Sequence, residues 1–162
     1  EEGRMVFSKQ AVGLLGLTRL AFVSFEREIE RKKLNINIKG EVSTIQADRD
    51  KLLLAIENLI DNAVEYTPEA ESIDIVLSEE KGGKKVRFCI SHPGPGIPKN
   101  QQHQIFSKFF RVRGDGHKET EGSGLGLYIT KNVIEGHGGK INFSSVEGEG
   151  SEFWFTLPIN SK

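Results

Sequence analysis

The sequence predicts an α+β fold, a two-layer α/β sandwich in which helices cover one face of a mixed, mostly antiparallel sheet. Two patterns predict it. Apolar residues recur at helical spacing over residues 51–66, and they alternate with polar residues in two pairs of short segments. Each pair is joined by a glycine-containing turn, so each indicates a hairpin whose apolar side packs against amphipathic helices.

Size and charge limit the possible functions. The chain has 162 residues and 36% hydrophobic content, so we expect one globular domain over residues 1–162. Its 22 basic and 23 acidic residues nearly cancel, which argues against nucleic acid or a membrane surface as a partner. Cys89 stands alone and no segment is apolar enough to span a membrane, which favours a cytoplasmic setting. Because the chain starts at Glu1, we expect a longer parent protein, which could be membrane-anchored.

The first third of the chain predicts two helices and two strands. Residues 10–33 have helical apolar spacing and end in a basic run, which indicates one helix. Residues 34–39 alternate as a half-buried strand does, and we expect a short strand near Ile45 to pair with them. Asp48 or Asp50 is then expected to cap the helix over residues 51–66.

The remainder predicts two hairpins and two more helices. Alternation over residues 73–77 and 86–90, and again over 141–143 and 153–155, indicates the hairpins. Between them we expect a short helix through Ile105 and Phe106, a mobile loop over residues 111–123 and a helix over 125–135. Residues 137–139, with two glycines, are expected to stop that last helix.

Asn58 and Asn62 are four residues apart and therefore share one face of the predicted helix. Their amides have two interpretations. Helix capping or inter-helix hydrogen bonding is the commoner role for an isolated pair. Alternatively, an amide oxygen can be a ligand of Mg²⁺, which prefers oxygen atoms and keeps several waters when it bridges phosphates.

Two glycine clusters are the other notable segments. Residues 94–98, Gly-Pro-Gly-Ile-Pro, follow a predicted strand and permit either a simple turn or close approach of a flat ligand. Residues 122–127, Gly-Ser-Gly-Leu-Gly-Leu, open a helix whose free N–H groups and dipole favour an anion. The second pattern is weak by itself, because the early strand of a parallel sheet that accompanies it in dinucleotide-binding folds is missing here.

Taken in order, these segments resemble the histidine kinase branch of the gyrase, Hsp90, histidine kinase and MutL ATPase superfamily, whose ATP-binding domains have the Bergerat-type fold. The resemblance spans most of the chain. Residues 58–63 with 66–68 are similar to its N box, 94–98 to its G1 box, 105–112 to its F box, 122–127 to its G2 box and 148–155 to its G3 strand. A gyrase-like or MutL-like ATPase would be expected to have a glutamate at position 58, where this chain has asparagine.

The resemblance implies ATP (or ADP) and Mg²⁺ as ligands and histidine phosphorylation in two-component signalling as the activity. Asn62 would hold the metal, Asn58 and Arg111 would act in catalysis, and residues 111–123 would form a lid over the ATP. The phosphoacceptor histidine would lie on a dimerisation domain outside this chain, with a response regulator as an indirect partner. The implied nucleotide contacts are Asn58, Asn62, His92, Gly94, Gly96, Ile97, Arg111, Gly122, Gly124, Leu125, Gly126 and Ser151.

The three phenylalanines of the F-box segment, Phe106, Phe109 and Phe110, are expected to pack in the core or under the lid. We do not expect them to contact the ligand directly.

Two residues depart from the family pattern. His92 stands where the family has an aspartate that accepts a hydrogen bond from adenine. A neutral imidazole can accept one such bond, with help from Ser151, or His92 is a loop residue without a ligand. Glu65 stands where a basic residue is common in the family, and its carboxylate would repel phosphate. Two alternatives remove this repulsion: Glu65 points to solvent, or a nearby cation compensates for its charge. The candidate cations are Lys108, Arg111, Arg113 and Lys118.

These departures leave two hypotheses. The first is a working kinase domain, which the intact asparagine pair, Arg111 and the glycines of residues 122–126 favour. The second is a degenerate, non-catalytic regulatory module that acts through partner contacts, which His92 and Glu65 favour.

Overall fold

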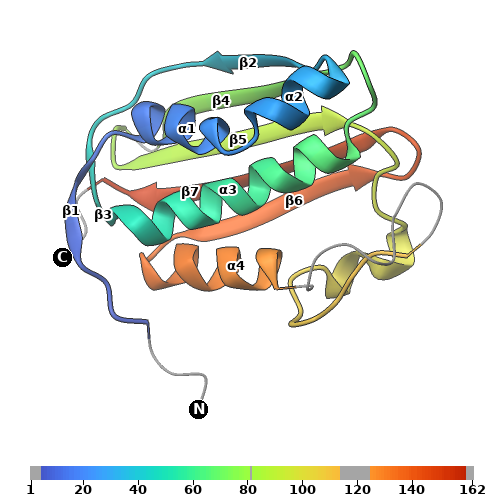
Figure 1. Ribbon diagram of the computed structural model, residues 1–162. Helices are drawn as coiled ribbons and strands as arrows, with labels where there is room; N and C mark the ends of the chain where they lie inside the picture. The colour runs from blue at the N-terminus through green and yellow to red at the C-terminus, as the bar shows by residue number, and fades with distance from the viewer. Residues whose placement is uncertain (1–4, 81, 114–124, 160–162) are drawn as a thin grey trace.

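A computed structural model describes residues 5–80, 82–113 and 125–159 of the chain (Figure 1). The elements in chain order are β1 (Lys9–Val12), α1 (Leu14–Val23), α2 (Glu26–Lys32), β2 (Asn35–Lys39), β3 (Ile45–Asp48), α3 (Arg49–Tyr66), β4 (Ser72–Glu80), β5 (Lys85–Pro93), the 3₁₀ helix η1 (Lys99–Gln104), α4 (Gly126–Gly136), β6 (Lys140–Val146) and β7 (Gly150–Pro158).

The main sheet has five strands in the order β2-β4-β5-β7-β6. Only β2 and β4 pair in parallel, and every other neighbouring pair in this sheet is antiparallel. Helices α1, α3 and α4 lie side by side over one face of the sheet (Figure 1). The predicted fold class and both predicted hairpins are therefore confirmed.

Helix α3 forms the centre of the core. Its apolar stripe is almost completely shielded from solvent, with Leu52, Ile56 and Ile60 each 0% exposed. Asp48 caps the helix by accepting a hydrogen bond of 3.1 Å from the Lys51 N–H, so the first of the two predicted caps is the observed one. The predicted helix therefore forms, and its polar face is turned toward the end of the sheet where the candidate site lies.

The single helix predicted over residues 10–33 is wrong. The segment contains strand β1 and two helices, because Gly13 lies between β1 and α1 and Phe25, outside the helical conformation, separates α1 from α2. The pairing expected for the strand near Ile45 is wrong as well, since β3 pairs antiparallel with β1. An alternating pattern predicts a strand but does not identify the strand that pairs with it. Here the partner, β1, lies mostly within the segment that was predicted to be a helix.

The segment after Pro98 also differs in part from the prediction. The short helix is a 3₁₀ helix that ends at Gln104, before Ile105 and Phe106. Phe106 and Phe110 pack against the core as expected, whereas Phe109 is 63% exposed and its predicted packing role is wrong. Residues 111–113 have no regular structure, and the rest of the predicted loop, 114–123, lies outside the described residues.

Cys89 is buried, and it lies on the opposite face of β5 from its apolar neighbours Phe88 and Ile90. Its thiol donates a hydrogen bond of 3.2 Å to a Glu152 carboxylate oxygen. Burial, reinforced by that carboxylate, raises the pKa of the thiol to about 11. The thiol therefore stays protonated and unreactive at neutral pH.

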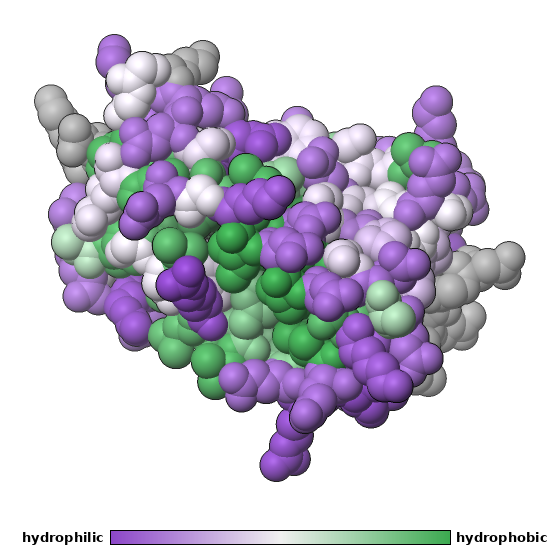
Figure 2. Space-filling view, turned by 90° about the horizontal axis from the view of Figure 1, so that it is seen from above, coloured by the Kyte–Doolittle hydropathy of each residue, from purple (hydrophilic) through white to green (hydrophobic). Residues whose placement is uncertain are grey.

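Figure 2 shows apolar side chains along the edge of the molecule formed by α1, α2 and β2. They line a shallow groove together with charged residues. The apolar residues are Phe22, Val23, Ile29, Leu34, Ile36 and Ile38, and the charged residues are Arg19, Glu26, Glu30 and Lys33. Among the described residues, no helix has the length and hydropathy needed to cross a membrane. The groove shares no residue with the cavity described next.

Candidate functional site

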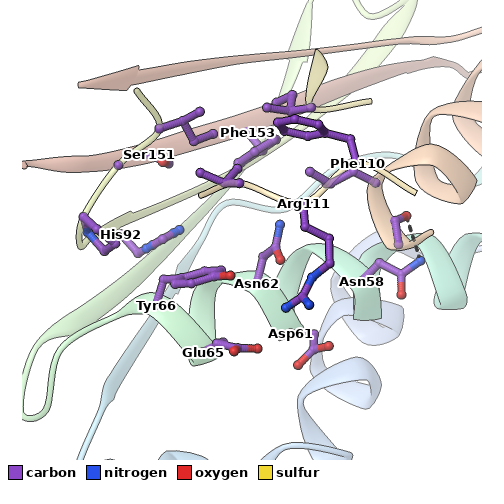
Figure 3. A pocket seen from close by; sticks show the side chains of 17 residues that line it. Asn58, Asp61, Asn62, Glu65, Tyr66, His92, Phe110, Arg111, Ser151 and Phe153 are labelled. Carbon is purple, nitrogen blue, oxygen red and sulfur yellow. Dashed lines mark hydrogen bonds between the residues drawn. The ribbon is translucent and has the colours of Figure 1, made fainter. Parts of the chain in front are cut away.

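A cavity of about 250 Å³ opens between α3, the ends of β5 and β7, and the segment that follows β5 (Figure 3). It brings together residues from every segment that the sequence singled out. Its walls are formed by Asn58, Asp61, Asn62, Glu65, Tyr66, His92, Pro95, Gly96, Ile97, Ile105, Phe110, Arg111, Val112, Gly126, Leu127, Ser151 and Phe153.

Helix α3 forms one wall through Asn58, Asn62 and Tyr66, which recur every four residues and so face the same side. The Asn58 amide nitrogen donates a hydrogen bond of 3.1 Å to the carbonyl of Gly126, the first residue of α4. The inter-helix interpretation of the asparagine pair is therefore observed for Asn58. This bond also fixes the orientation of the amide, so that its oxygen remains available as an acceptor.

His92 and Ser151 stand opposite each other on β5 and β7 and form one end of the cavity. The His92 Nδ1 lies 2.9 Å from the Pro93 carbonyl oxygen. Because a carbonyl oxygen only accepts, Nδ1 carries the hydrogen and Nε2 is left as an acceptor. His92 is thus a strand residue in the cavity wall, and the interpretation as a loop residue is wrong.

Burial lowers the pKa of His92 below its ordinary value. The Pro93 carbonyl opposes this shift and the Lys32 ammonium group adds to it. The ring is therefore neutral at neutral pH, which is the form that can accept a hydrogen bond.

The Gly-Pro-Gly-Ile-Pro turn forms the adjoining wall. Gly96 has a φ of +67°, and a β-carbon there would collide with the Val146 carbonyl. The Ile97 N–H donates to the Ser145 hydroxyl over 2.8 Å, and the Gln102 side chain donates to the Ile97 carbonyl over 3.0 Å. Gly94 does not line the cavity, since it packs against the end of α3 behind the wall.

Sequence reasoning did not find Ser145 or Gln102, which hold this turn in place. The one available signal was strand register, because Ser145 pairs with Ser151 in the last hairpin.

Arg111 brings a positive charge to the site. In Figure 3 its side chain extends from the loop toward α3, where Asn58, Asp61 and Asn62 lie. The other proposed compensating cations lie elsewhere: Lys108 is exposed over the Phe109 and Tyr128 rings, and Arg113 is exposed. Lys118 lies outside the described residues.

Glu65 does not point to solvent, so that expectation is wrong. Its side chain lines the cavity and also a second pocket next to Arg31 and Lys32, and one of its carboxylate oxygens is fully buried. The Lys32 ammonium group donates to the Val64 and Glu65 carbonyls over 2.7 and 3.0 Å, near the C-terminal end of α3. A cation therefore lies beside this part of the helix.

The start of α4 closes the other end of the cavity through Gly126 and Leu127, with Leu125 as the N-cap residue. Gly122 and Gly124 lie outside the described residues. Over the described part of the chain, no cluster of three or more His, Cys, Asp or Glu side chains could hold a metal ion. A cation at this site would instead need amide oxygens together with oxygen atoms of its ligand.

Residues 47–161 match the family described as histidine kinase-, DNA gyrase B- and HSP90-like ATPase. The chain belongs to this family. The match includes α3 and every later element of this ATPase domain, and hence all the residues that line the cavity.

Similar proteins identify the histidine kinase branch. The ATPase domain is 38% identical over 133 residues to the adaptive-response sensory kinase SasA of Synechococcus sp. (strain JA-3-3Ab), covering 81% of this chain and 34% of SasA. The chain thus spans about a third of that relative's length.

Solved structures agree. The catalytic domain of the histidine kinase ThkA superposes with a TM-score of 0.80 at 32% identity, covering 95% of this chain and 97% of that one. Full-length ShkA, solved with AMPPNP, gives 0.82 at 30% identity and covers 99% of this chain and 33% of its own. The ATPase domain therefore has the fold of a histidine kinase catalytic domain.

Proposed function

We propose that this domain binds ATP with Mg²⁺ and passes the γ-phosphoryl group to a histidine on a separate dimerisation domain of a longer sensor kinase. A response regulator would then receive the phosphoryl group, and the domain would work in the cytoplasm. The observation that carries the proposal is the cavity itself, which joins the α3 amides, the start of α4 and a half-buried acceptor at His92.

The chemistry of the walls supports one direction for the bound nucleotide. The first N–H groups of α4 lack helical partners, and the helix dipole makes that end partly positive. The phosphates therefore belong near Gly126 and Leu127, and the base belongs near His92 and Ser151. Arg111 would neutralise charge on the γ-phosphate as it develops during transfer.

The described residues fit Mg²⁺ at the phosphate end. Mg²⁺ binds through one or two protein oxygens together with phosphates and waters, so it needs no cage of carboxylates. Asn62 would supply the amide oxygen, while Asn58, held by Gly126, would orient its own oxygen beside it. When bound, the ion would supply positive charge that stabilises the negative charge of the phosphates.

The regulatory-module alternative is favoured by Glu65, whose carboxylate lies in the wall. A helix rises about 1.5 Å per residue, so Glu65 lies roughly 10 Å along α3 from Asn58. Asn62, the proposed Mg²⁺ ligand, is only about 4.5 Å from Glu65 along the helix, so Glu65 stands between the phosphate end and the base end. His92 retains an accepting nitrogen at the base end, which leaves the kinase proposal better supported.

Calorimetric titration of the chain with ADP and AMPPNP, with and without Mg²⁺, tests the proposal. We expect micromolar to sub-millimolar binding that weakens at least about tenfold without Mg²⁺ or in Asn62→Ala. Asn100→Ala is the matched control, because Asn100 is exposed and outside the cavity. Absence of binding at millimolar nucleotide would contradict the proposal and favour the regulatory module.

A further inference from the structure

Ser145, on β6, is at the centre of a hydrogen-bond network behind the base end of the cavity. Its hydroxyl oxygen accepts from the Ile97 N–H over 2.8 Å, and its own hydrogen is donated to the Gly150 carbonyl over 3.0 Å. The Ser151 hydroxyl oxygen lies 2.8 Å from the Ser145 hydroxyl oxygen. A hydroxyl group has a single hydrogen, and either serine could donate in this last contact; when the Gly150 carbonyl takes the Ser145 hydrogen, Ser151 is the donor.

The arrangement in which both Gly150 and Ser145 are satisfied sets the direction of the Ser151 hydroxyl. Its hydrogen points toward Ser145, and only its lone pairs remain for a ligand in the cavity. Opposite Ser151, the neutral His92 ring is in the same state, because Nδ1–H donates to the Pro93 carbonyl and Nε2 can only accept. In this arrangement His92 and Ser151 both present acceptors to the cavity.

We propose that Ser145 is a specificity-determining residue: by accepting the Ser151 hydrogen, it makes this end of the cavity an acceptor for hydrogen bonds and selects a 6-amino purine over a 6-keto purine. The inference rests on the proposed nucleotide-binding function and adds a residue outside the cavity lining to it. The amino group of adenine supplies two N–H donors. A 6-keto group supplies an oxygen, which would face two acceptors.

The selection should be substantial. A bound keto ligand would cover these acceptors and leave them without hydrogen-bond donors. Binding sites built to hydrogen-bond one polar group reject analogues that lack that group. Removing the Ser145 hydroxyl would release the Ser151 hydrogen, so that Ser151 could rotate and donate to a keto oxygen. The expected consequence is a gain in binding of the keto analogue, which damage to the site would not produce.

The test compares binding of ADP and inosine diphosphate, with Mg²⁺, to the 162-residue chain at pH 8, where His92 is neutral. We expect inosine diphosphate to bind at least about tenfold more weakly than ADP. Ser145→Ala should reduce this ratio at least about threefold by improving the keto ligand, and Ser145→Thr, which keeps a hydroxyl, should restore it. Ser144→Ala is the matched control, because Ser144 is the exposed neighbour on the other face of β6.

Equal binding of the two nucleotides, or a ratio that Ser145→Ala leaves unchanged, overturns the role of Ser145 while the proposed function stands. Failure of both nucleotides to bind overturns the proposed function and this inference together. If the Ser145→Ala variant does not fold, the Ser151→Ala variant is tested in its place, because Ser151→Ala removes the hydroxyl group that Ser145 orients. A ratio that survives Ser151→Ala also overturns the inference.

Discussion

His92 shows how one side chain can take over a role through its surroundings. A carboxylate is expected at this position in the family, and an imidazole accepts only when it is neutral. The end of β5 keeps the imidazole neutral and able to accept, because the Pro93 carbonyl accepts the Nδ1 hydrogen and burial disfavours the charged ring. The acceptor is preserved, but it becomes sensitive to pH.

We therefore expect ADP affinity to fall as the solution is acidified. Burial lowers the pKa of His92 below the ordinary histidine value of about 6.5, so the ring stays neutral at pH 6.5 and above. The loss of affinity should therefore begin only below about pH 6.5. His92→Asp should remove the dependence, because an aspartate stays ionised well below that pH. Titration calorimetry between about pH 8 and pH 5 measures it.

His103→Ala is the control for this experiment, since His103 is exposed and outside the cavity. Constant affinity across the range in the unmodified chain would contradict the role of His92 in base binding.

At the scale of elements, the site depends on how closely the turn after β5 approaches the hairpin of β6 and β7. The Gly148 N–H donates to the Pro95 carbonyl over 2.7 Å, and the Gly94 N–H donates to the Glu149 carbonyl over 3.1 Å. Gly96 lies against the Val146 backbone at a positive φ. The turn can therefore approach the hairpin this closely only without a side chain at position 96.

We expect Gly96→Ala to lower the free energy of unfolding by about 1–3 kcal/mol, since it combines left-handed strain with a backbone collision. Nucleotide binding should weaken as well, because Gly96 lines the cavity. Urea unfolding and ADP titration measure the two effects.

Gly82→Ala separates strain from collision. Gly82 has a similar φ of +64° in the turn between β4 and β5, but no atom of the described residues lies within 4 Å of an added β-carbon. It should show the strain alone and leave binding unchanged. Equal losses of stability in the two variants would show that the close approach at Gly96 has no energetic importance.

At the scale of the whole molecule, His137 joins parts of the chain that are far apart in sequence. It is 3% exposed at the end of α4, where Nδ1 donates to the Val133 carbonyl over 2.8 Å. Its Nε2 accepts from the Asp48 N–H over 2.9 Å, across 89 positions of sequence. The Phe7 ring packs edge-on against it at 4.6 Å. The ring thus ties α4 to the start of α3 and to the segment before β1.

Stability should fall in mild acid for this reason. The pKa of His137 is lowered, first by burial and further by Lys9 and Lys51, although the Val133 carbonyl and Asp48 oppose the shift. The unfolded chain therefore takes up a proton near pH 6.5 that the folded chain does not, and folded stability is lost below that pH. The loss is at most about 1.4 kcal/mol per pH unit for one group.

Urea unfolding at about pH 7.5 and pH 5.5 tests this, with His137→Gln expected to show a smaller decrease. Asp48 does not contribute in this window, because its pKa is lowered by hydrogen bonds from Ser8 and Lys51, against the effect of burial, and it stays ionised. His92 accounts for part of the remaining dependence. An equal decrease in both proteins would contradict the role of His137.

Local patterns identified most of the fold and most of the site. Asn58 and Asn62 on one helix face, both hairpins and the helix after residue 125 follow from periodicities of 3.6 and 2 residues and from glycine turns, which depend only on neighbouring residues. The same order of segments indicated the family and the residues that meet in the cavity.

The sequence by itself therefore determined the fold class, the family and the identity of most cavity-lining residues. The tertiary structure alone decided the pairing of β1 with β3, the position of Glu65 in the cavity wall, the hydrogen positions on His92 and the network of Ser145. The physical reason is the same in each case. Burial and many hydrogen-bond partners are set by chain segments that meet only on folding, so no local pattern records them.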